Sequence, residues 1–596
     1  MSVPNILLRN VAGLTLNRNS PPLWSTRTSL LAGDRLEKLP RPLIRFTDIV
    51  NGPSSGLGDG FGVGAIVTVW GQGFGEPRGQ VYFTDSLGVK RPAAHIYYWK
   101  KADGLAPGGP AELFRSHFMY EVAFSLPDSA AGVGMISIER ADGQESWLPY
   151  PFTVRPGNIL WVAPDGNNLN AGTYPNPKQF INAGSPNSGN IGRSMGVGDI
   201  IYSRGVNEPD LGGRGLYVVS APGTKESTNA IIAYPGTQST VNCADNGFHL
   251  YLSTGVALSK YRIQVGSVLE PTDGSVISAN PHNFHINACK WGRAVGNHLS
   301  DKDGYCMTGQ AGAIVGSGNA IHEFVCAGNH IFDVGCDGTT HYQHTTYFTI
   351  RNDPDMAEVS APSVEFNFLE DCKAKYGIHV YDQYSAAGTY FPMVGNLRIT
   401  NNVIVNQKGS GINVEANSGM NWVISIYIVN NILDRCGMGP IAEPGNGVDA
   451  TALRVKGWMM PTDVIIKDNY IRGYSDASSR LHGHPYALVL NFEVDTPPIT
   501  VEGNIVESDD PAFGLVNMGS GLGNLVENNN YFNYTGALPA EFTTIPGEVI
   551  VDKYGVSYYT FPGSAQTGLN ATNAEDYDIY GVPRSGATVG PMEIFE

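Results

Sequence analysis

Short segments in which apolar and polar residues alternate recur along most of the chain. Residues 65–69, 118–124 and 378–382 are clear examples. A period of two is that of a β-strand with one buried face. Gly and Pro residues separate the segments, as expected of tight turns between strands. The pattern predicts an all-β protein.

The C-terminal half repeats one unit: an alternating strand, an Asn, two apolar or aromatic residues, a turn, and a second strand. Successive Asn stand 25 to 38 residues apart, which a β-helix tolerates because insertions leave the stack as loops. If the Asn occurred only as a turn residue, the apolar pair that follows it and the strand that precedes it would not be explained. We therefore predict a right-handed parallel β-helix, a solenoid, over residues 157–535. The repeat positions are Asn329, Asn367, Asn402, Asn431, Asn469, Asn504 and Asn529.

The repeated Asn has a physical reason to lie inside the solenoid. Its amide can donate to one neighbouring coil and accept from the other, forming a ladder that satisfies buried polar groups at each level. Cys372 and Cys436 both lie five residues after a repeat Asn. We expect them at small apolar interior positions, without a catalytic role.

Other segments flank the predicted solenoid. Residues 1–45 have no clean periodicity and several Pro, as expected of an N-terminal arm for particle attachment. Residues 46–156 contain short alternating strands and predict a small immunoglobulin-like β-sandwich. The Val67–Gly75 strand and turn and the closing Pro151–Val154 strand resemble those of IPT/TIG modules. Residues 536–596 are expected to form a C-terminal cap or tail.

Charge and cysteine content exclude several classes of partner. The formal net charge is −17 and no Lys/Arg-rich run opposes it, so nucleic acid is an unfavourable partner. The 7 Cys show no C-x-x-C pair, so neither a zinc site nor a dense disulfide scaffold is indicated. We expect no metal and no cofactor. The start of the chain lacks an export-signal pattern, and no apolar run of about 18 residues predicts membrane insertion.

Candidate chemistry follows the second strand of each repeat. Period two sends Ile378, Val380 and their counterparts inward, so the polar residues between them line one outer face. Stacking should then form two columns. One column contains His379, Asn413 and Arg454, and the other contains Tyr381, Glu415 and Lys456.

These columns would bring a base, a carboxylate and cations within reach of one or two sugar rings. For β-elimination on a uronic acid, His379 or Tyr381 could take the proton while Arg454 or Lys456 neutralises the sugar carboxylate. Ordinary exposed strands also carry mixed polar residues, and hydrolysis remains open. The predicted catalytic residues here are His379, Tyr381, Glu415 and Arg454, with Asn413 and Lys456 as substrate-binding residues.

A second group of titratable residues lies one repeat earlier. Asp333 and Asp371 each follow a repeat Asn by four residues and are expected to stack as paired carboxylates, which suits glycoside hydrolysis. Solvated turn aspartates are the alternative. With Asp337 they complete the candidate catalytic set. Further candidate substrate-binding residues on strands and loops are His341, His344, Asp382, Tyr384 and Tyr390.

Several segments in order resemble known β-helix proteins. Residues 159–167, 172–177 and 197–205 resemble the opening of pectate-lyase-like β-helix proteins, and 576–596 resembles the ending of secreted bacterial ones. The order of arm, small β-module, β-helix and tail resembles bacteriophage tailspike or tail-fibre depolymerases. That resemblance implies a homotrimer in the virion tail, bound through its arm to other tail or baseplate proteins, which recognises bacterial surface polysaccharide.

Three functions are therefore predicted as alternatives. The first is a phage tailspike that binds and depolymerises capsule, exopolysaccharide or O-antigen. The second is a bacterial polysaccharide lyase or epimerase. The third is a glycan-binding adhesin or structural tail component without catalysis. The sequence leaves hydrolase, lyase and binding alone open.

Overall fold

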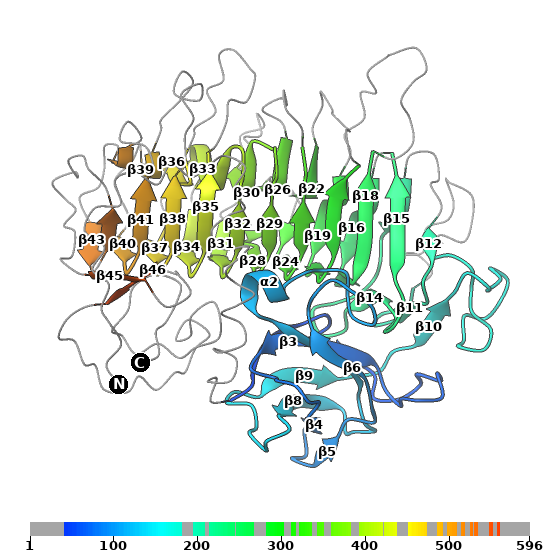
Figure 1. Ribbon diagram of the computed structural model, residues 1–596. Helices are drawn as coiled ribbons and strands as arrows, with labels where there is room; N and C mark the ends of the chain where they lie inside the picture. The colour runs from blue at the N-terminus through cyan, green and yellow to red at the C-terminus, as the bar shows by residue number, and fades with distance from the viewer. Residues whose placement is uncertain are drawn as a thin grey trace, which may run out of the picture.

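The computed structural model is an elongated β-helix with a small β-sandwich against one side (Figure 1). The predicted arm lies almost wholly outside the described residues. The structure describes residues 41–181, 195–208, 214–244, 246–266, 282–302, 311–316, 321–335, 343–350, 359–382, 393–420, 422–437, 451–459, 461–473, 486–492, 498–508, 514–518, 525–528, 530–533, 548–551 and 557–560.

Three parallel sheets run along the length of the β-helix, as the sequence predicts. Sheet I contains β10 (Ile159–Val162), β11 (Ile200–Ser203), β14 (Asn229–Ala233), β17 (Val256–Ser259), β20 (Arg293–Val295), β24 (Val325–Ala327), β27 (Val359–Ser360), β28 (Ser363–Glu365), β31 (Met393–Thr400), β34 (Trp422–Val429), β37 (Asp463–Lys467), β40 (Ile499–Glu502) and β43 (Leu525–Asn528). Sheet II contains β12 (Asn207–Glu208), β15 (Ser239–Cys243), β18 (Tyr261–Val265), β21 (His298–Asp301), β25 (His330–Phe332), β29 (Phe368–Glu370), β32 (Val403–Val405), β35 (Ile432–Cys436), β38 (Tyr470–Gly473), β41 (Ile505–Ser508) and β44 (Tyr531–Asn533). Sheet III contains β13 (Arg214–Val219), β16 (Asn246–Thr254), β19 (His282–Lys290), β22 (Ala311–Gly316), β23 (Ile321–His322), β26 (Gln343–Ile350), β30 (Tyr376–Asp382), β33 (Ser410–Met420), β36 (Leu453–Met459), β39 (Tyr486–Phe492) and β42 (Gly514–Met518).

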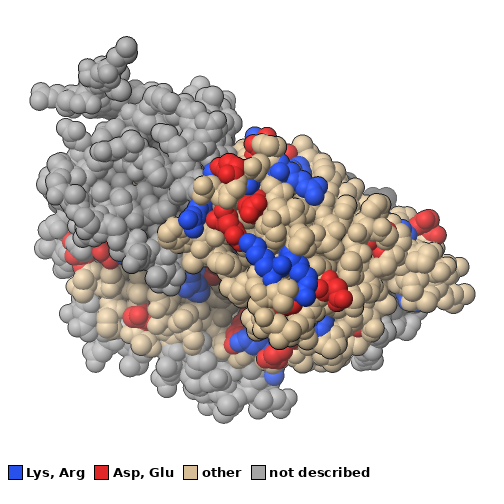
Figure 2. All heavy atoms as spheres, turned by 90° about the horizontal axis from the view of Figure 1, so that it is seen from below, with Lys and Arg blue, Asp and Glu red and all other residues tan. Residues whose placement is uncertain are grey.

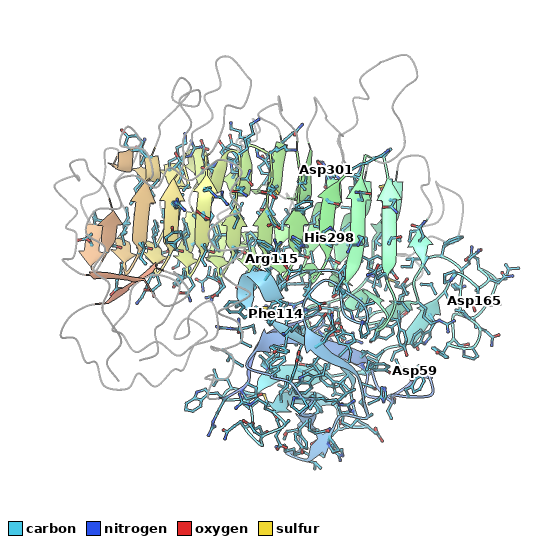
Figure 3. The ribbon with its side chains drawn as sticks, viewed as in Figure 1. Asp59, Phe114, Arg115, Asp165, His298 and Asp301 are labelled. Carbon is cyan, nitrogen blue, oxygen red and sulfur yellow. The ribbon has the colours of Figure 1, made fainter. Side chains whose placement is uncertain are left out.

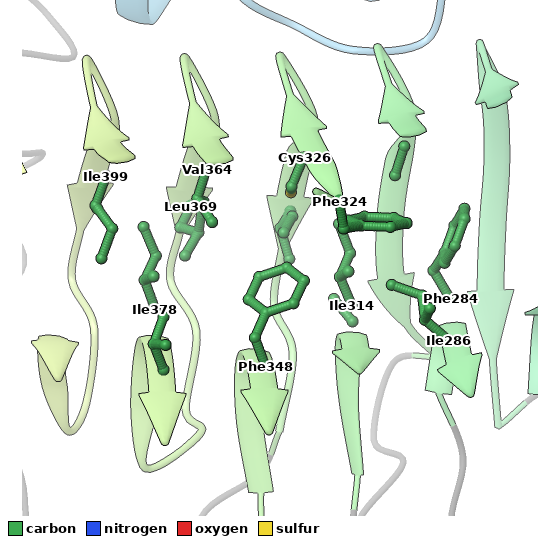
Figure 4. Packing of buried hydrophobic residues seen from close by; sticks show 14 of the residues in the cluster. Phe284, Ile286, Ile314, Phe324, Cys326, Phe348, Val364, Leu369, Ile378 and Ile399 are labelled. Carbon is green, nitrogen blue, oxygen red and sulfur yellow. The ribbon is translucent and has the colours of Figure 1, made fainter. Parts of the chain in front are cut away.

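Alternate residues of every sheet point into one continuous apolar interior. In sheet III, Ile378 and Val380 are fully buried, and Ile412 and Val414 occupy the same positions one coil later. Figure 4 shows Phe284, Ile314, Phe348 and Ile378 filling this space from successive strands. Each coil therefore buries its apolar side chains against the coils on either side, which lets the core grow with the length of the solenoid. Cys372 and Cys436 lie in this core, as predicted.

From β20 onward, a two-residue turn joins sheet I to sheet II, and its second residue is the repeat Asn. Each of these Asn is fully buried, and its Nδ2 donates to Oδ1 of the next Asn over 2.8 to 3.0 Å. The same Nδ2 donates to a backbone carbonyl of the preceding coil, as from Asn402 to Val364 over 2.8 Å. The predicted amide ladder is confirmed from Asn329 to Asn504.

The ladder is longer than predicted at its start and shifted by one residue at its end. Asn297 donates to Asn329 and so adds an earlier level. The last level is Asn530, whose Oδ1 accepts from Asn504, so the prediction of Asn529 was wrong by one residue. Of the three consecutive Asn at 528–530, only Asn530 is followed by two aromatic residues, and the pairing of β40 with β43 gives the same register.

The N-terminal module has two packed sheets. One sheet has four strands and the other has five. β1 begins two residues before the end of the segment predicted as an arm. One sheet contains β1 (Leu43–Thr47), β3 (Ile66–Gln72), β7 (Tyr120–Ser125) and β6 (His95–Lys101), and the other contains β2 (Asn51–Gly52), β9 (Tyr150–Val154), β8 (Gly132–Glu139), β4 (Gln80–Thr84) and β5 (Lys90–Pro92).

The sandwich packs directly on the outer sides of sheets I and II. A short helix, α2 (Phe114–His117), presents Arg115 to the Glu370 carboxylate of sheet II in a bidentate ion pair, where Figure 3 labels Arg115. His117 Nε2 lies 2.8 Å from the Asn401 carbonyl oxygen. Apolar side chains of both parts form shared clusters, such as Phe46 and Trp70 with Val295. The sandwich is therefore held rigidly beside the edge that carries the Asn ladder.

The face of the sandwich carries charges of both signs, and the C-terminal tail contains a hairpin. Figure 2 shows Lys and Arg interleaved with Asp and Glu on the sandwich face, without a broad patch of one sign. β45 (Glu548–Val551) and β46 (Ser557–Thr560) form an antiparallel hairpin within the predicted tail. Within the described ranges, no helix is long and apolar enough to cross a membrane.

Candidate glycan-binding face

The outer face of sheet III carries the polar residues that the sequence singles out. The strand register aligns His379, Asn413 and Arg454 on three successive coils. It aligns Tyr381, Glu415 and Lys456 in the neighbouring column. The geometry of both predicted columns is therefore observed, and their catalytic role stays a prediction.

Arg454 is the centre of a buried polar group. Its Nε donates to Asn413 Oδ1 over 2.6 Å, and its Nη2 donates to Glu415 Oε2 over 2.7 Å and to the Tyr376 hydroxyl over 3.1 Å. Lys456 Nζ lies 3.3 Å from the other carboxylate oxygen of Glu415. Arg454 is 3% exposed, so the planar guanidinium holds these side chains in one arrangement.

The cations keep Glu415 ionised. Burial alone would raise the pKa of Glu415, but the charges of Arg454 and Lys456 outweigh it and hold the pKa below its usual value. A carboxylate of this kind can act as a base or nucleophile, or can fix the position of a cation. It is not a proton donor near neutral pH.

Ring side chains surround His379 on the same face. Tyr347 and Tyr381 stack on the imidazole at centroid distances of 5.0 and 5.4 Å, and Tyr376 and His344 lie 4.4 and 4.7 Å away. Burial, with the nearby His344 and Arg454, holds the pKa of His379 well below its usual value. The neutral imidazole is able to accept a proton.

His379 also has unsatisfied hydrogen-bonding capacity. It is 5% exposed, and within the described part of the chain neither ring nitrogen has a hydrogen-bond partner. Buried polar atoms in native proteins are nearly always paired, so an orphaned pair of this kind calls for an explanation.

A column of carboxylates follows the edge between sheets II and III. Register places Asp301, Asp333 and Asp371 at equivalent positions on successive coils, directly after Ser300, Phe332 and Glu370. Asp333 forms an ion pair with Lys373 over 3.0 Å, and Asp371 accepts from Asn406 Nδ2 over 2.6 Å. The predicted stacking of Asp333 and Asp371 on neighbouring coils is observed.

Asp301 differs from the other two carboxyls. Burial and the charge of Asp333 raise the pKa of Asp301 to about 7, although the Gly335 amide donates to its Oδ2 over 2.8 Å. Figure 3 labels Asp301 near the end of β21. A protonated carboxyl beside an ionised one is the pairing on which acid–base cleavage of a glycoside depends. Sequence reasoning missed Asp301, although it follows Asn297 by four residues just as Asp333 follows Asn329.

Several candidate residues cannot be placed. Asp382 ends β30, and its side chain is outside the described residues. Sequence reasoning also missed Tyr347, which pairs with His379 on the next coil, and Tyr376, which begins β30. Asp337, His341, Tyr384 and Tyr390 lie outside the described ranges altogether.

Metal and thiol chemistry find little support at this face. Across the residues that the structure describes, no group of three or more His, Cys, Asp or Glu is arranged to hold a metal ion. Burial raises the pKa of the Cys289, Cys326 and Cys372 thiols to about 12, which disfavours a nucleophilic thiolate.

Comparison with known proteins bears on the fold alone. No family model and no curated protein matches the chain. Among solved structures, the chain is similar to XylC in complex with xylose, with 9% identity and a TM-score of 0.36 over 74% of this chain and 98% of that one. It is also similar to a Family 28 exopolygalacturonase of Yersinia enterocolitica, with 10% identity and a TM-score of 0.37 over 83% of this chain and 99% of that one.

Proposed function

We propose that this protein binds and depolymerises a bacterial surface polysaccharide, in the manner of a phage tailspike. The observation that carries the proposal is the outer face of sheet III, where stacked rings surround an unpartnered His379 beside the Arg454–Glu415 pair. Flat rings pack on the apolar faces of sugars, and the adjacent polar groups can bind hydroxyl and carboxylate substituents.

The sheet III group is arranged for β-elimination from a uronate. Neutral His379 would take the proton from C5 while Lys456, one-third exposed, neutralises the sugar carboxylate. The C5 electron pair then forms the C4–C5 double bond as the C4–O bond breaks. The leaving oxygen takes a proton, which the Tyr381 hydroxyl, in the column of Glu415 and Lys456, would supply.

The carboxylate column offers hydrolysis as the second candidate. Asp301, whose pKa is about 7, would protonate the leaving glycosidic oxygen. Asp333, ion-paired with Lys373, would activate the water or attack the sugar itself. The two routes use different residues and yield different products, so one experiment separates them.

That experiment is a cleavage assay on capsule, exopolysaccharide and lipopolysaccharide preparations. New reducing ends with absorbance near 235 nm would identify elimination, and reducing ends without absorbance would identify hydrolysis. Binding without either product would favour an adhesin or a structural tail component. We expect His379→Ala to abolish elimination, and Asp301→Asn to abolish hydrolysis. No binding to any preparation contradicts the proposal.

We also propose the particle context of a tailspike. In this proposal the chain is a homotrimer in the virion tail, the segment before β1 attaches it to other tail or baseplate proteins, and the sandwich is an IPT/TIG-like spacer. The support is the order of parts and the rigid packing of the sandwich on the β-helix. Native mass spectrometry and proteomics of purified virions test it. A monomer secreted by uninfected bacteria would instead favour a bacterial lyase or epimerase.

A further inference from the structure

A second ring cluster lies on sheet III, several coils before His379. Tyr217, His249 and His285 align on three successive coils at outward positions. The His249 and His285 rings stack at 4.4 Å between centroids, and Tyr217 lies 4.9 Å from His249. His282 lies 4.7 Å from His285 on the adjacent column. We call Tyr217, His249, His282 and His285 the distal cluster.

The distal cluster repeats the local sequence of the proposed site. His249 stands between Phe248 and Leu250, and His285 stands between Phe284 and Ile286, just as His379 stands between Ile378 and Val380. In each case the two apolar neighbours are fully buried, so the fold sends the imidazole outward. Three coils of one sheet therefore present a His at the same position of the strand.

The strand register places the ring groups around His285 and His379 in one column of sheet III, which we call the strip. The column that contains His249 and His285 continues through Val315 to Tyr347 and His379, and then to Asn413 and Arg454. Neighbouring coils are about 4.8 Å apart, so the strip from Tyr217 to Arg454 spans roughly 34 Å. His285 and Tyr347 are two coils apart, which is roughly 10 Å. Val315 between the two groups is 4% exposed, so a glycan along the strip would pass over it to contact both groups.

We propose that the distal cluster is a second binding subsite for pyranose rings of the polysaccharide that the proposed site cleaves. The inference rests on the proposed function. It adds the orientation of the polymer, which would lie along the axis of the β-helix. Tyr217, His249 and His285 are each partly exposed, so their ring edges and faces reach a ligand from outside. Ring faces supply stacking contacts with pyranose rings.

The probe is a size series of oligosaccharides. It is prepared by partial acid hydrolysis of the preparation that binds in the panel above, and affinity is measured by calorimetry. The test variant is His249→Ala/His285→Ala, and Thr240→Ala on the outer side of sheet II is the control. We expect the double variant to bind the longest oligosaccharides about tenfold more weakly, because two ring contacts are lost. The shortest oligosaccharides should bind both proteins equally.

A further variant distinguishes the loss of a ring contact from a loss of folding. His285→Phe keeps the ring face and removes its nitrogens, so it should retain most of the affinity for long oligosaccharides. Equal binding of the double variant and the parent protein at every length would overturn the inference and leave the proposed function standing. An equal loss at every length would overturn it as well. Absence of binding to every polysaccharide of the panel overturns both proposals.

Discussion

The edge where sheets I and II meet differs from sheet III in the length of its connections and in the side chains it carries. Where sheet I meets sheet II, two residues make each turn from β20 onward, and the buried Asn ladder satisfies its polar atoms coil after coil. Sheet III is bordered by long connections, such as the ten residues between Asp382 and Met393. Its outer face carries His, Tyr, Arg and carboxylate side chains. One side fixes the stacking of coils, and the other varies in length and chemistry.

The contrast separates stability from function. A ladder position must be Asn, because both its donors and its acceptor are used inside the protein. An outward position of sheet III has no such requirement, since its neighbours in the strand already supply the core. Changes on the ladder side should therefore affect folding, and changes on the sheet III face should affect binding and cleavage.

The largest stability loss is expected from Asn402→Ala. The change removes the acceptor of the Asn367 amide groups and the donors to Val364 and Asn431. Each buried polar group left unpaired costs about 1–3 kcal/mol, so a total loss of at least about 3 kcal/mol is expected. Urea unfolding measures it. Asn207→Ala, at an exposed position of sheet II, is the control and should change the midpoint little.

Glu415→Ala should affect both properties, because Arg454 is buried and would lose its counter-charge. Breaking a buried ion pair costs about 3–5 kcal/mol, and the partial exposure of Glu415 reduces this to about 2–3 kcal/mol. Cleavage should fall at least about tenfold. Glu226→Ala, at an exposed site, serves as the control. A variant with full cleavage and unchanged stability would remove Glu415 from the site.

The sandwich contact can be tested at Gly328, whose backbone has a φ of +60°. A Cβ there would lie 2.2 Å from Cζ of Phe46 in the sandwich, so Gly328→Ala should push the module outward. Such overpacking costs about 1–3 kcal/mol, and limited proteolysis should cut the sandwich free more readily. Gly143→Ala also has positive φ but meets no atom within 4 Å, so it controls for backbone strain. Equal effects of the two variants would contradict tight packing.

A pH dependence of stability is expected at Asp301. Its pKa is about 7 in the folded protein against 3.8 ordinarily, so the folded state holds a proton that the unfolded chain releases. Its contribution to stability is therefore complete below about pH 4 and is lost as the pH rises to about 7. Asp301→Asn removes this loss. The variant should unfold at higher urea than the parent protein at about pH 8, with the difference shrinking toward about pH 4.

Much of the fold was predictable because the solenoid repeats local signals. Period-two strands and a regularly placed Asn sufficed for the β-helix and for the inward direction of Ile378 and Val380. Asn297 follows Gly296 as Asn329 follows Gly328, so the same signal was present one coil earlier. The shift from Asn529 to Asn530 could have been foreseen, because only Asn530 is followed directly by two aromatic residues, Tyr531 and Phe532.

The site was predictable only where the repeat aligns a residue of one strand with its counterpart on the next coil. The columns of His379 and Tyr381 followed from the repeat, but the contact of Arg454 with the Tyr376 hydroxyl depends on side chains two coils apart. The raised pKa of Asp301 likewise depends on burial by other coils. In the distal cluster, His249 and His285 also had a sequence signal, because each lies between two apolar residues. Both lie on strands where no repeat Asn had been recognised.

The most direct test of the central claim is the structure of the protein bound to an oligosaccharide from the polysaccharide it recognises, at near-atomic resolution. The account predicts sugar rings along the outer face of sheet III, with one ring against Tyr347 and His379 and others toward His285. Sugar density confined to the sandwich, or to the outer sides of sheets I and II, would contradict it.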